Sequence, residues 1–222
     1  MKIITFALWG DSPKYLIGAK LNAEQARIIY PDWKCRYYVA PDVPSESLEV
    51  VESFPNTEIV EVDAPSDWTF SYNRFLPMSE DGVEALISRD TDSRIAAREG
   101  SAVKEWLDSY YSFHIMRDHP WHHSYPILAG MFGCKGGVIE DVQGKIEDYN
   151  KIDTYHSDQD FLRDVIHPIV SDQAMIHDDW LGRPFPVKRW GLNFVGQVFD
   201  EKNVSVPEHV AVLERFLEER DQ

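Results

Sequence analysis

Cysteine and long apolar runs are scarce in this chain, and each shortage excludes a class of protein. The two cysteines, Cys35 and Cys134, are too few for a disulfide framework and lack the Cys-x-x-Cys spacing of zinc sites. No run approaches the roughly 18 apolar residues that a membrane-spanning helix requires. The apolar N-terminus reaches Asp11 too soon for a signal peptide, so we interpret it as a buried first strand and expect a cytoplasmic protein.

Positive charge is also in short supply, because 22 Lys and Arg face 38 Asp and Glu, a formal net charge of -16. A surface of this sign repels nucleic acid and anionic lipid over about a Debye length, roughly 10 Å at 0.1 M salt. We therefore expect neither nucleic-acid binding nor membrane insertion. Hydrophobic residues still make up 43% of the chain, which is enough for a folded core.

The first 94 residues alternate between strand-like and helix-like patterns. Segments rich in β-forming residues cover 2–9, 35–40, 58–62 and 83–88, with helical spacing before Tyr30-Pro31 and again over 45–54. Strands that alternate with helices in this way are typical of a mostly parallel sheet with flanking helices. The sequence therefore predicts an α/β fold.

After residue 94 the regular alternation stops. Helices are expected at about 95–109, over 158–169 and near 210–219, while apolar, glycine-bounded and histidine-rich segments lie between them. We find no internal repeat, low-complexity tract or linker. The sequence therefore predicts one domain over residues 1–222, with halves at 1–94 and 95–222.

The acidic pair Asp90 and Asp92 follows the strand predicted at 83–88. Open α/β sheets collect their ligands at the carboxyl ends of parallel strands, and two carboxylates one residue apart can both approach a divalent cation. Arg89 and Arg94 flank the pair and could bind substrate oxygens or neutralise surplus carboxylate charge. A solvated acidic turn is the alternative interpretation.

Histidines and a second acidic cluster supply further candidates. His177 could complete a metal's coordination, with Lys188 or Arg189 stabilising a leaving diphosphate, and a structural histidine is the alternative. Asp158 and Gln159 begin a helical pattern, where they could face the reacting group of a substrate or simply favour the helix N-terminus. Four histidines near position 120 could bind zinc or make structural hydrogen bonds, and one of the middle two could lie near an acceptor: His114, His119, His122 and His123.

The order of these motifs resembles that of GT-A glycosyltransferases, especially glycogenin-like and bacterial galactosyltransferase enzymes. Asp90-Thr91-Asp92 matches their metal-binding Asp-x-Asp, and 158–162 resembles their Asp-Gln-Asp-x-Leu helix start. Residues 129–132 are similar to the Ala-Gly-Val segment that walls their acceptor site. Residues 11–19 are similar to their Asp-x-Tyr-x-x-Gly-Ala stretch, with one extra residue. His177 and Lys188 resemble their late His and Lys, but eleven positions separate the two here.

Over most of its length the chain also resembles the compact glycosyltransferase domains of large algal viruses, through segments at 87–94, 116–120 and 194–200. Together the resemblances imply a GT-A, Rossmann-like fold with a smaller acceptor-side region. Residues 1–94 would bind the nucleotide, and 95–222 would bind the acceptor and close the site. For a viral protein the expected location is the host cytoplasm, with a role in viral glycosylation.

The activity that the resemblance implies is metal-dependent transfer of a hexosyl group from a UDP- or dTDP-sugar to a glycan or protein-linked acceptor, with Mn²⁺ or Mg²⁺ as cofactor. The partners would be the nucleotide-sugar donor and a glycan or glycoprotein acceptor. The implied metal ligands are Asp90, Asp92 and His177; the implied donor-binding residues are Ala7, Leu8, Trp9, Tyr15, Arg74, Arg89, Asp90 and Lys188. The implied residues facing the sugar are Asp158 and Gln159, with Gly130 and His119 on the acceptor side.

Two other interpretations use the same residues. One is a metal-dependent phosphohydrolase built on His114, His119 and His177-Asp178. The other is a non-catalytic glycan-binding module, in which some of the 7 Trp and 10 Tyr residues stack on sugars.

Overall fold

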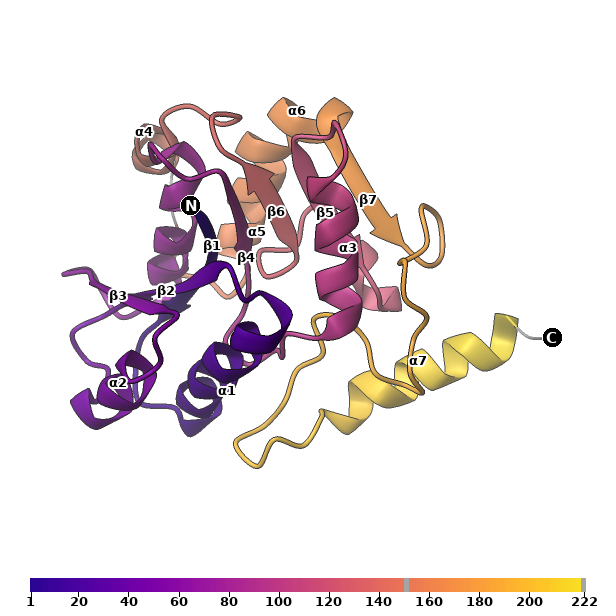
Figure 1. Ribbon diagram of the computed structural model, residues 1–222, viewed down its shortest axis with the longest axis horizontal. Helices are drawn as coiled ribbons and strands as arrows, with labels where there is room; N and C mark the ends of the chain where they lie inside the picture. Colours follow the sequence, from indigo (N-terminus) through magenta and orange to yellow (C-terminus); the bar gives the residue numbers. More distant parts are fainter. Residues whose placement is uncertain (150–151, 221–222) are drawn as a thin grey trace.

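The computed structural model describes residues 1–149 and 152–220. They form a seven-stranded sheet in the order β3-β2-β1-β4-β6-β5-β7, with helices on both faces (Figure 1). The strands are β1 (Lys2–Leu8), β2 (Trp33–Val39), β3 (Thr57–Glu61), β4 (Ala85–Ser88), β5 (Phe113–Arg117), β6 (Phe132–Lys135) and β7 (Ala174–Asp178).

Within the described residues β6 alone runs against the other strands. It pairs antiparallel with β4 and with β5, whereas β1 is parallel to β2 and β4, β2 is parallel to β3, and β5 is parallel to β7. The mostly parallel sheet predicted from the sequence is therefore confirmed. Because their carboxyl ends lie at one edge, loops distant in sequence meet there.

Helices and short turns cover the two faces of the sheet. The α-helices are α1 (Pro13–Ile29), α2 (Ser45–Glu52), α3 (Ala97–Leu107), α4 (Val142–Asp148), α5 (Ser157–Phe161), α6 (His167–Val170) and α7 (Pro207–Arg220). The 3₁₀ segments are η1 (Trp68–Ser79), η2 (Pro120–His123) and η4 (Ser171–Gln173), and η3 (Leu162–Ile166) is a π turn between α5 and α6. No helix of the described residues is long and apolar enough to cross a membrane.

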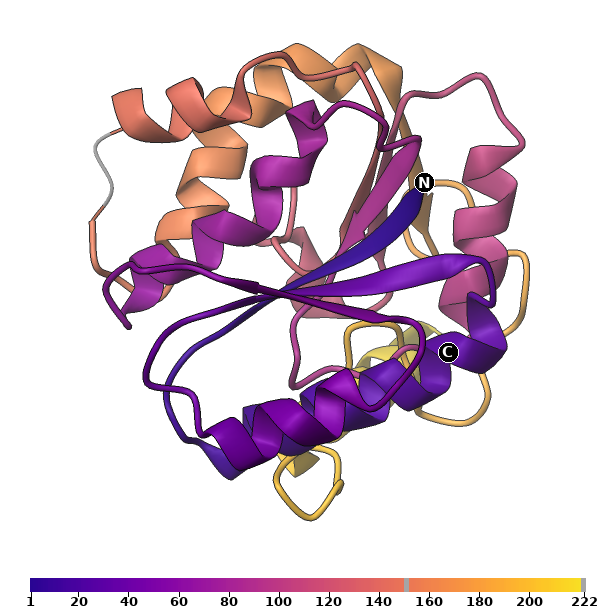
Figure 2. The same cartoon turned by 60° about the vertical axis from the view of Figure 1, so that its left-hand side comes forward.

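Side chains of β1 alternate between two hydrophobic cores. Ile4, Phe6 and Leu8 pack with α1, α2 and α3, whereas Ile3 packs with η1, α4, α5 and α6 on the opposite face. Figure 2 shows the sheet between the indigo and purple helices of one layer and the orange helices of the other. This period of two follows from the pleat of a strand that is buried on both faces.

Local sequence signals set the ends of α1. Pro13 occupies its first turn, where proline suits the helix because its fixed φ is helical and no amide hydrogen is needed. The helix stops at Ile29, before the Tyr30-Pro31 pair that disfavours helical backbone. The predicted strands and helices of residues 1–94 are thus confirmed to within a few residues. After residue 94 the helices are also confirmed, but β5, β6 and β7 come from segments that the sequence had not indicated as strands.

Candidate functional site

A pocket lies at the carboxyl ends of β1 and β4. The end of β1, the first turn of α1, η1 and the loop after β4 form one part of its lining. The loop before β6, the start of α5 and the segment around Gly196 form the rest. Most residues selected from the sequence line it: Ala7, Leu8, Trp9, Tyr15, Arg74, Asp90, Asp92, Gly130, Asp158 and Gln159.

The two acidic residues after β4 are paired with cations in this pocket. Asp90 forms an ion pair with Arg74, and Asp92 Oδ2 lies 2.6 Å from Lys14 Nζ. Burial and the nearby charge of Asp90 raise the pKa of Asp92, and Lys14 and Arg94 oppose that rise. Burial and then the charges of Asp92 and Asp90 raise the pKa of Tyr15 to about 12. The pocket wall therefore carries concentrated negative charge that favours a bound cation.

Two glycines allow the acidic loop to approach its neighbours. A Cβ at Gly18 would lie 1.9 Å from the carbonyl oxygen of Thr91, and a Cβ at Gly130 would lie 2.1 Å from Asp90 Oδ2. Neither distance is possible for non-bonded atoms, so a side chain at Gly18 would displace the loop backbone and one at Gly130 would displace the Asp90 carboxylate. Both glycines therefore help to set the position of the Asp90 and Asp92 carboxylates.

Asn22 is a site-positioning residue that sequence reasoning missed. This buried side chain donates hydrogen bonds to the carbonyls of Thr91 (3.2 Å) and Ser93 (2.9 Å), and its oxygen accepts one from the Ile95 amide (3.1 Å). Its signal in the sequence is a polar residue four positions after Gly18, on the buried face of α1. A buried amide at that place satisfies backbone groups of the loop that follows β4.

Arg74 connects two of the acidic residues of the pocket. Its guanidinium, buried in η1, contacts Asp90 through one nitrogen and Asp158 Oδ2 through the other at 2.6 Å. The remaining Asp158 oxygen accepts a hydrogen bond from the Gln159 amide at 2.8 Å. The helix cap is His156, and no side chain makes a capping hydrogen bond there. Asp158 therefore lines the pocket in contact with Arg74, and it also accepts a backbone amide in the first turn of α5, so it serves both the pocket and the helix N-terminus.

Asp90 and Asp92 fit a divalent cation such as Mn²⁺ or Mg²⁺. Magnesium usually binds one or two carboxylates together with substrate phosphates and water, because it requires an octahedral oxygen shell. Among residues 1–149 and 152–220 no group of three His, Cys, Asp or Glu side chains could hold a metal by itself. The donor set thus suits a cation that phosphate oxygens help to hold.

The structure does not bring His177, which the resemblance implied as a third ligand, to this pair. His177 lies in β7, with Nδ1 2.7 Å from His114 Nε2 and Nε2 3.3 Å from Glu105 Oε2. β7 is the edge strand and lies three strand spacings, about 14 Å, from β4. Burial lowers the pKa of His177, and the side chain does not line the pocket.

Arg89 and Lys188 also lie outside the pocket lining. Arg89 is 2% exposed, and its Nε donates to Glu99 Oε1 at 2.8 Å in the protein interior. Lys188 is exposed on the segment after β7. The cation that does lie beside Asp92 is Lys14, from the first turn of α1.

His119, implied by the resemblance on the acceptor side, does not line the pocket. His119 is 2% exposed, and its Nε2 lies 3.0 Å from the backbone oxygen of His209 in α7, so this side chain connects η2 with the C-terminal helix. His122, three residues later, lines the pocket. A zinc site is not assembled from the described histidines, because no metal-binding group forms among them.

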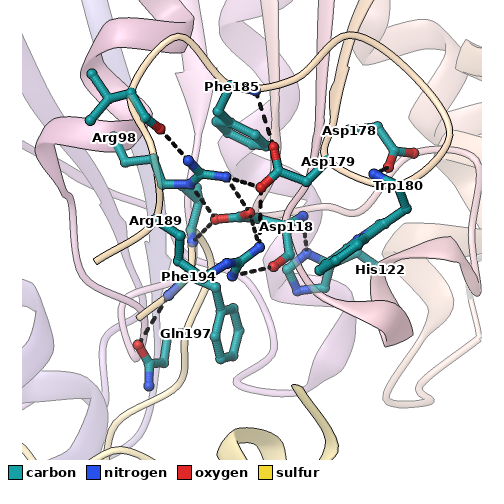
Figure 3. Close-up of polar contacts among 12 residues, drawn as sticks. Arg98, Asp118, His122, Asp178, Asp179, Trp180, Phe185, Arg189, Phe194 and Gln197 are labelled. Atoms are coloured by element: carbon teal, nitrogen blue, oxygen red, sulfur yellow. Dashed lines mark hydrogen bonds and ion pairs between the residues drawn. The ribbon is translucent and has the colours of Figure 1, made fainter. Parts of the chain in front are cut away.

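Asp118, directly after β5, joins the pocket wall to a buried ionic cluster (Figure 3). Its carboxylate accepts hydrogen bonds from Arg98 (2.9 Å), Arg189 (2.6 Å) and the Val195 amide (2.8 Å). Asp179 pairs with the same two arginines, so two acids neutralise two bases. The segment held in this way continues to Gly196 and Val198, which line the pocket.

The same segment reaches the acidic loop through the backbone. Val198 forms a bridge with Ser93, and the Phe199 amide donates to the carbonyl oxygen of Asp92 at 2.9 Å. The cluster around Asp118 therefore controls one wall of the pocket, although it lies outside the lining itself.

No protein-family model and no curated protein matches this chain, but its fold is similar to that of several solved structures. One is a glycosyltransferase involved in glycosylation of the major capsid of PBCV-1, with 14% identity, 80% of this chain and 81% of that chain covered, and a TM-score of 0.52. Another is the galactosyltransferase LgtC in complex with donor and acceptor sugar analogs, with 14% identity, coverage of 81% and 74%, and a TM-score of 0.52.

A third structure, 4-diphosphocytidyl-2C-methyl-D-erythritol synthase from Anaerococcus prevotii, is 9% identical, with 98% of both chains covered and a TM-score of 0.51. At these identities the comparisons show the fold alone. The GT-A, Rossmann-like α/β fold that the sequence predicted is thereby confirmed.

Proposed function

We propose that this protein is a metal-dependent glycosyltransferase that moves a sugar from a UDP- or dTDP-sugar to a glycan or protein-linked acceptor. One observation carries the proposal: Asp90, Asp92 and Asp158 meet in a single pocket at the carboxyl ends of parallel strands. A similar fold occurs in the PBCV-1 capsid glycosyltransferase and in the galactosyltransferase LgtC, solved with donor and acceptor sugar analogs, which supports the same conclusion.

The donor would lie across the strand ends. The nucleoside would contact Ala7, Leu8, Trp9 and Tyr15 at the end of β1, and the diphosphate would lie at β4. Mn²⁺ or Mg²⁺ held by Asp90 and Asp92 would supply Lewis-acid stabilisation of the diphosphate charge. Lys14, which pairs with Asp92, is positioned to bind a phosphate oxygen in place of the distant Lys188.

The sugar would lie beside Asp158 and Gln159. Arg74 holds the Asp158 carboxylate in place, where it can stabilise positive charge at the reacting carbon or accept a proton from the acceptor. In this arrangement residues 1–94 bind the nucleotide and metal, and residues 95–222 supply Gly130, Asp158 and Gln159 on the sugar and acceptor side.

The rival interpretations have less support. A phosphohydrolase would need its histidines together with acids around a metal, but His114 and His177 are buried against each other and His119 bonds to the backbone of α7. A glycan-binding module would use exposed aromatic side chains, and Trp68 and Tyr155 do line the pocket. Glycan binding alone would not require the three carboxylates of Asp90, Asp92 and Asp158.

A panel of nucleotide sugars with Mn²⁺ tests the proposal. We expect release of nucleoside diphosphate from one donor, faster with an acceptor and lost with a chelator. Pyrophosphate release from a nucleoside triphosphate would instead indicate nucleotidyl transfer, and phosphate release from simple phosphomonoesters would indicate a phosphohydrolase. Glycan binding with no turnover of any donor would indicate the binding module.

A further inference from the structure

His122 presents one defined hydrogen-bonding group to the pocket. Its Nδ1 accepts a hydrogen bond from the Asp118 backbone amide at 3.1 Å (Figure 3). An imidazole nitrogen that accepts from a backbone N–H carries no proton, so the neutral ring must carry its proton on Nε2. Burial and the neighbouring His119, His123 and Arg189 charges keep the pKa of His122 well below its usual range. The ring is therefore neutral, with a fixed tautomer.

The Nε2–H group is the free end of this ring. Within residues 1–149 and 152–220, Nε2 has no hydrogen-bond partner, while the side chain lines the pocket. The neighbours of the ring on the protein side are Gly196, the Phe194 ring with its centroid 5.9 Å away and the His119 ring with its centroid 5.5 Å away, and none of them accepts a hydrogen bond from Nε2. An acceptor for Nε2–H must therefore come from the pocket side.

The position of His122 along the strand ends indicates which part of a substrate it meets. It follows β5, which lies two strand spacings, about 10 Å, from β4 on the side away from β1. A donor with its nucleoside at β1 and its diphosphate at β4 extends its sugar toward β6 and β5. The oxygen atoms available there are hydroxyls of the transferred sugar or of a sugar acceptor.

We infer that His122 binds a sugar hydroxyl as a neutral hydrogen-bond donor, through the tautomer that the Asp118 amide selects. This inference rests on the proposed function. It also excludes His122 as the general base, because Nε2 already holds a proton and Nδ1 already accepts the Asp118 amide. In the proposed reaction the histidine fixes the orientation of the sugar, and proton transfer belongs to another group.

Two substitutions separate this binding role from a structural one. In His122→Asn the side-chain oxygen can replace Nδ1 and keep the Asp118 bond, but no donor reaches the pocket. In His122→Gln the longer amide can place an N–H near the position of Nε2. We expect unchanged melting temperatures, a loss of about threefold to tenfold in kcat/KM for the nucleotide sugar in the Asn variant, and partial recovery in the Gln variant.

Binding measurements with Mn²⁺ identify the group that is recognised. UDP should bind the wild type and the Asn variant equally, since His122 lies beyond the diphosphate. Weaker binding of UDP-glucose or UDP-galactose would assign the contact to the donor sugar, and a raised KM for the acceptor alone would assign it to the acceptor. Equal loss of UDP affinity would overturn the hydroxyl assignment.

The tautomer is tested independently of any substrate. Nitrogen NMR of the wild type should show His122 with an unprotonated Nδ1 and a protonated Nε2, and with no titration between pH 6 and 8. A protonated Nδ1, or full activity in the Asn variant, would overturn the inference. If no nucleotide sugar binds the wild type at all, the proposed function fails even where the tautomer is as stated.

Discussion

Residues 1–94 form their part of the pocket from the ends of parallel strands, whereas residues 95–222 form theirs from loops held by buried charges. In the first region β1 and β4 lead directly into Trp9 and Asp90, and apolar packing beneath them fixes the strand ends. In the second region the wall at Gly196 depends on Asp118, which gathers two arginines and a backbone amide in the interior.

The difference shows two ways of placing polar groups. A strand end is positioned by hydrophobic burial, which is non-directional and tolerates changes on its exposed side. A buried ionic cluster is positioned by directional bonds, and it fails if one charge is lost, because the partners remain buried without compensation. The fold should therefore tolerate loss of Asp92, whose partner Lys14 is partly exposed, better than loss of Asp118, whose partners are buried.

Asp118→Ala should give the largest effect, because it leaves Arg98 and Arg189 with an uncompensated buried charge. We expect the free energy of unfolding to fall by about 3–5 kcal/mol, measured by urea denaturation followed by tryptophan fluorescence. The exposed Asp172→Ala, in the same region, should change it by at most about 0.5 kcal/mol. Equal stability of the two variants would show that the cluster does not hold this region together.

Asp92→Ala should separate binding from folding in the other region. Its carboxylate is buried, and burial disfavours its charge, whereas its partner Lys14 is partly exposed and can turn to solvent, so we expect a stability change of at most about 1 kcal/mol. Affinity for UDP with Mn²⁺ should fall at least about tenfold, because the cation loses one of two protein ligands. Calorimetric titration beside the exposed Asp63→Ala measures this, and matching affinities in both variants would contradict the metal site.

Gly130→Ala tests whether the second region sets the geometry of the first. The added Cβ would lie 2.1 Å from Asp90 Oδ2, so the carboxylate must move. Overpacking of this kind costs about 1–3 kcal/mol, and UDP affinity with Mn²⁺ should fall. Gly182→Ala is the control, since the nearest atom to its Cβ is 3.2 Å away. Unchanged affinity in Gly130→Ala would mean that Asp90 is not a ligand.

Acid should weaken the second region selectively, because all eight histidines lie after residue 94. Burial lowers the pKa of His114 and His122 well below 6.5 in the folded protein. Below about pH 6.5 the unfolded chain therefore binds more protons than the folded one, so the free energy of unfolding falls as pH falls, by about 1.4 kcal/mol per pH unit for each proton.

Hydrogen exchange at pH 7 and pH 5.5 locates this effect. Amides of β5 and β7, which carry His114 and His177, should lose protection first, and amides of β1 and β2 last. A His114→Asn variant should show a shallower dependence of stability on pH. Uniform loss of protection across the sheet would mean that the acid sensitivity does not arise from the buried histidines.

Local sequence patterns were sufficient to predict many of the strands, helices and pocket residues of this protein. The alternation over residues 1–94, and the place of Asp90 and Asp92 after an apolar strand, can be predicted because strand period, turn residues and parallel topology act over short distances in the chain. The same holds for Asp158, whose helix start lies beside the pocket. Gly18 and Gly130 lie in motifs that the sequence shows. Only the structure reveals how closely they approach the acidic loop.

The sequence by itself determined the order of strands and helices in the first region, the sign of the surface charge and the acidic loop at the sheet edge. Only the tertiary structure decided that His177 lies with His114 at the edge strand, that Lys14 and not Lys188 accompanies Asp92, and that His122 and not His119 faces the pocket. These outcomes depend on contacts such as those of Asp118 with Arg189 and Val195, 71 and 77 positions later. Sequence spacing does not predict contacts between residues so far apart in the chain, because folding and the burial of charge select which side chains pair.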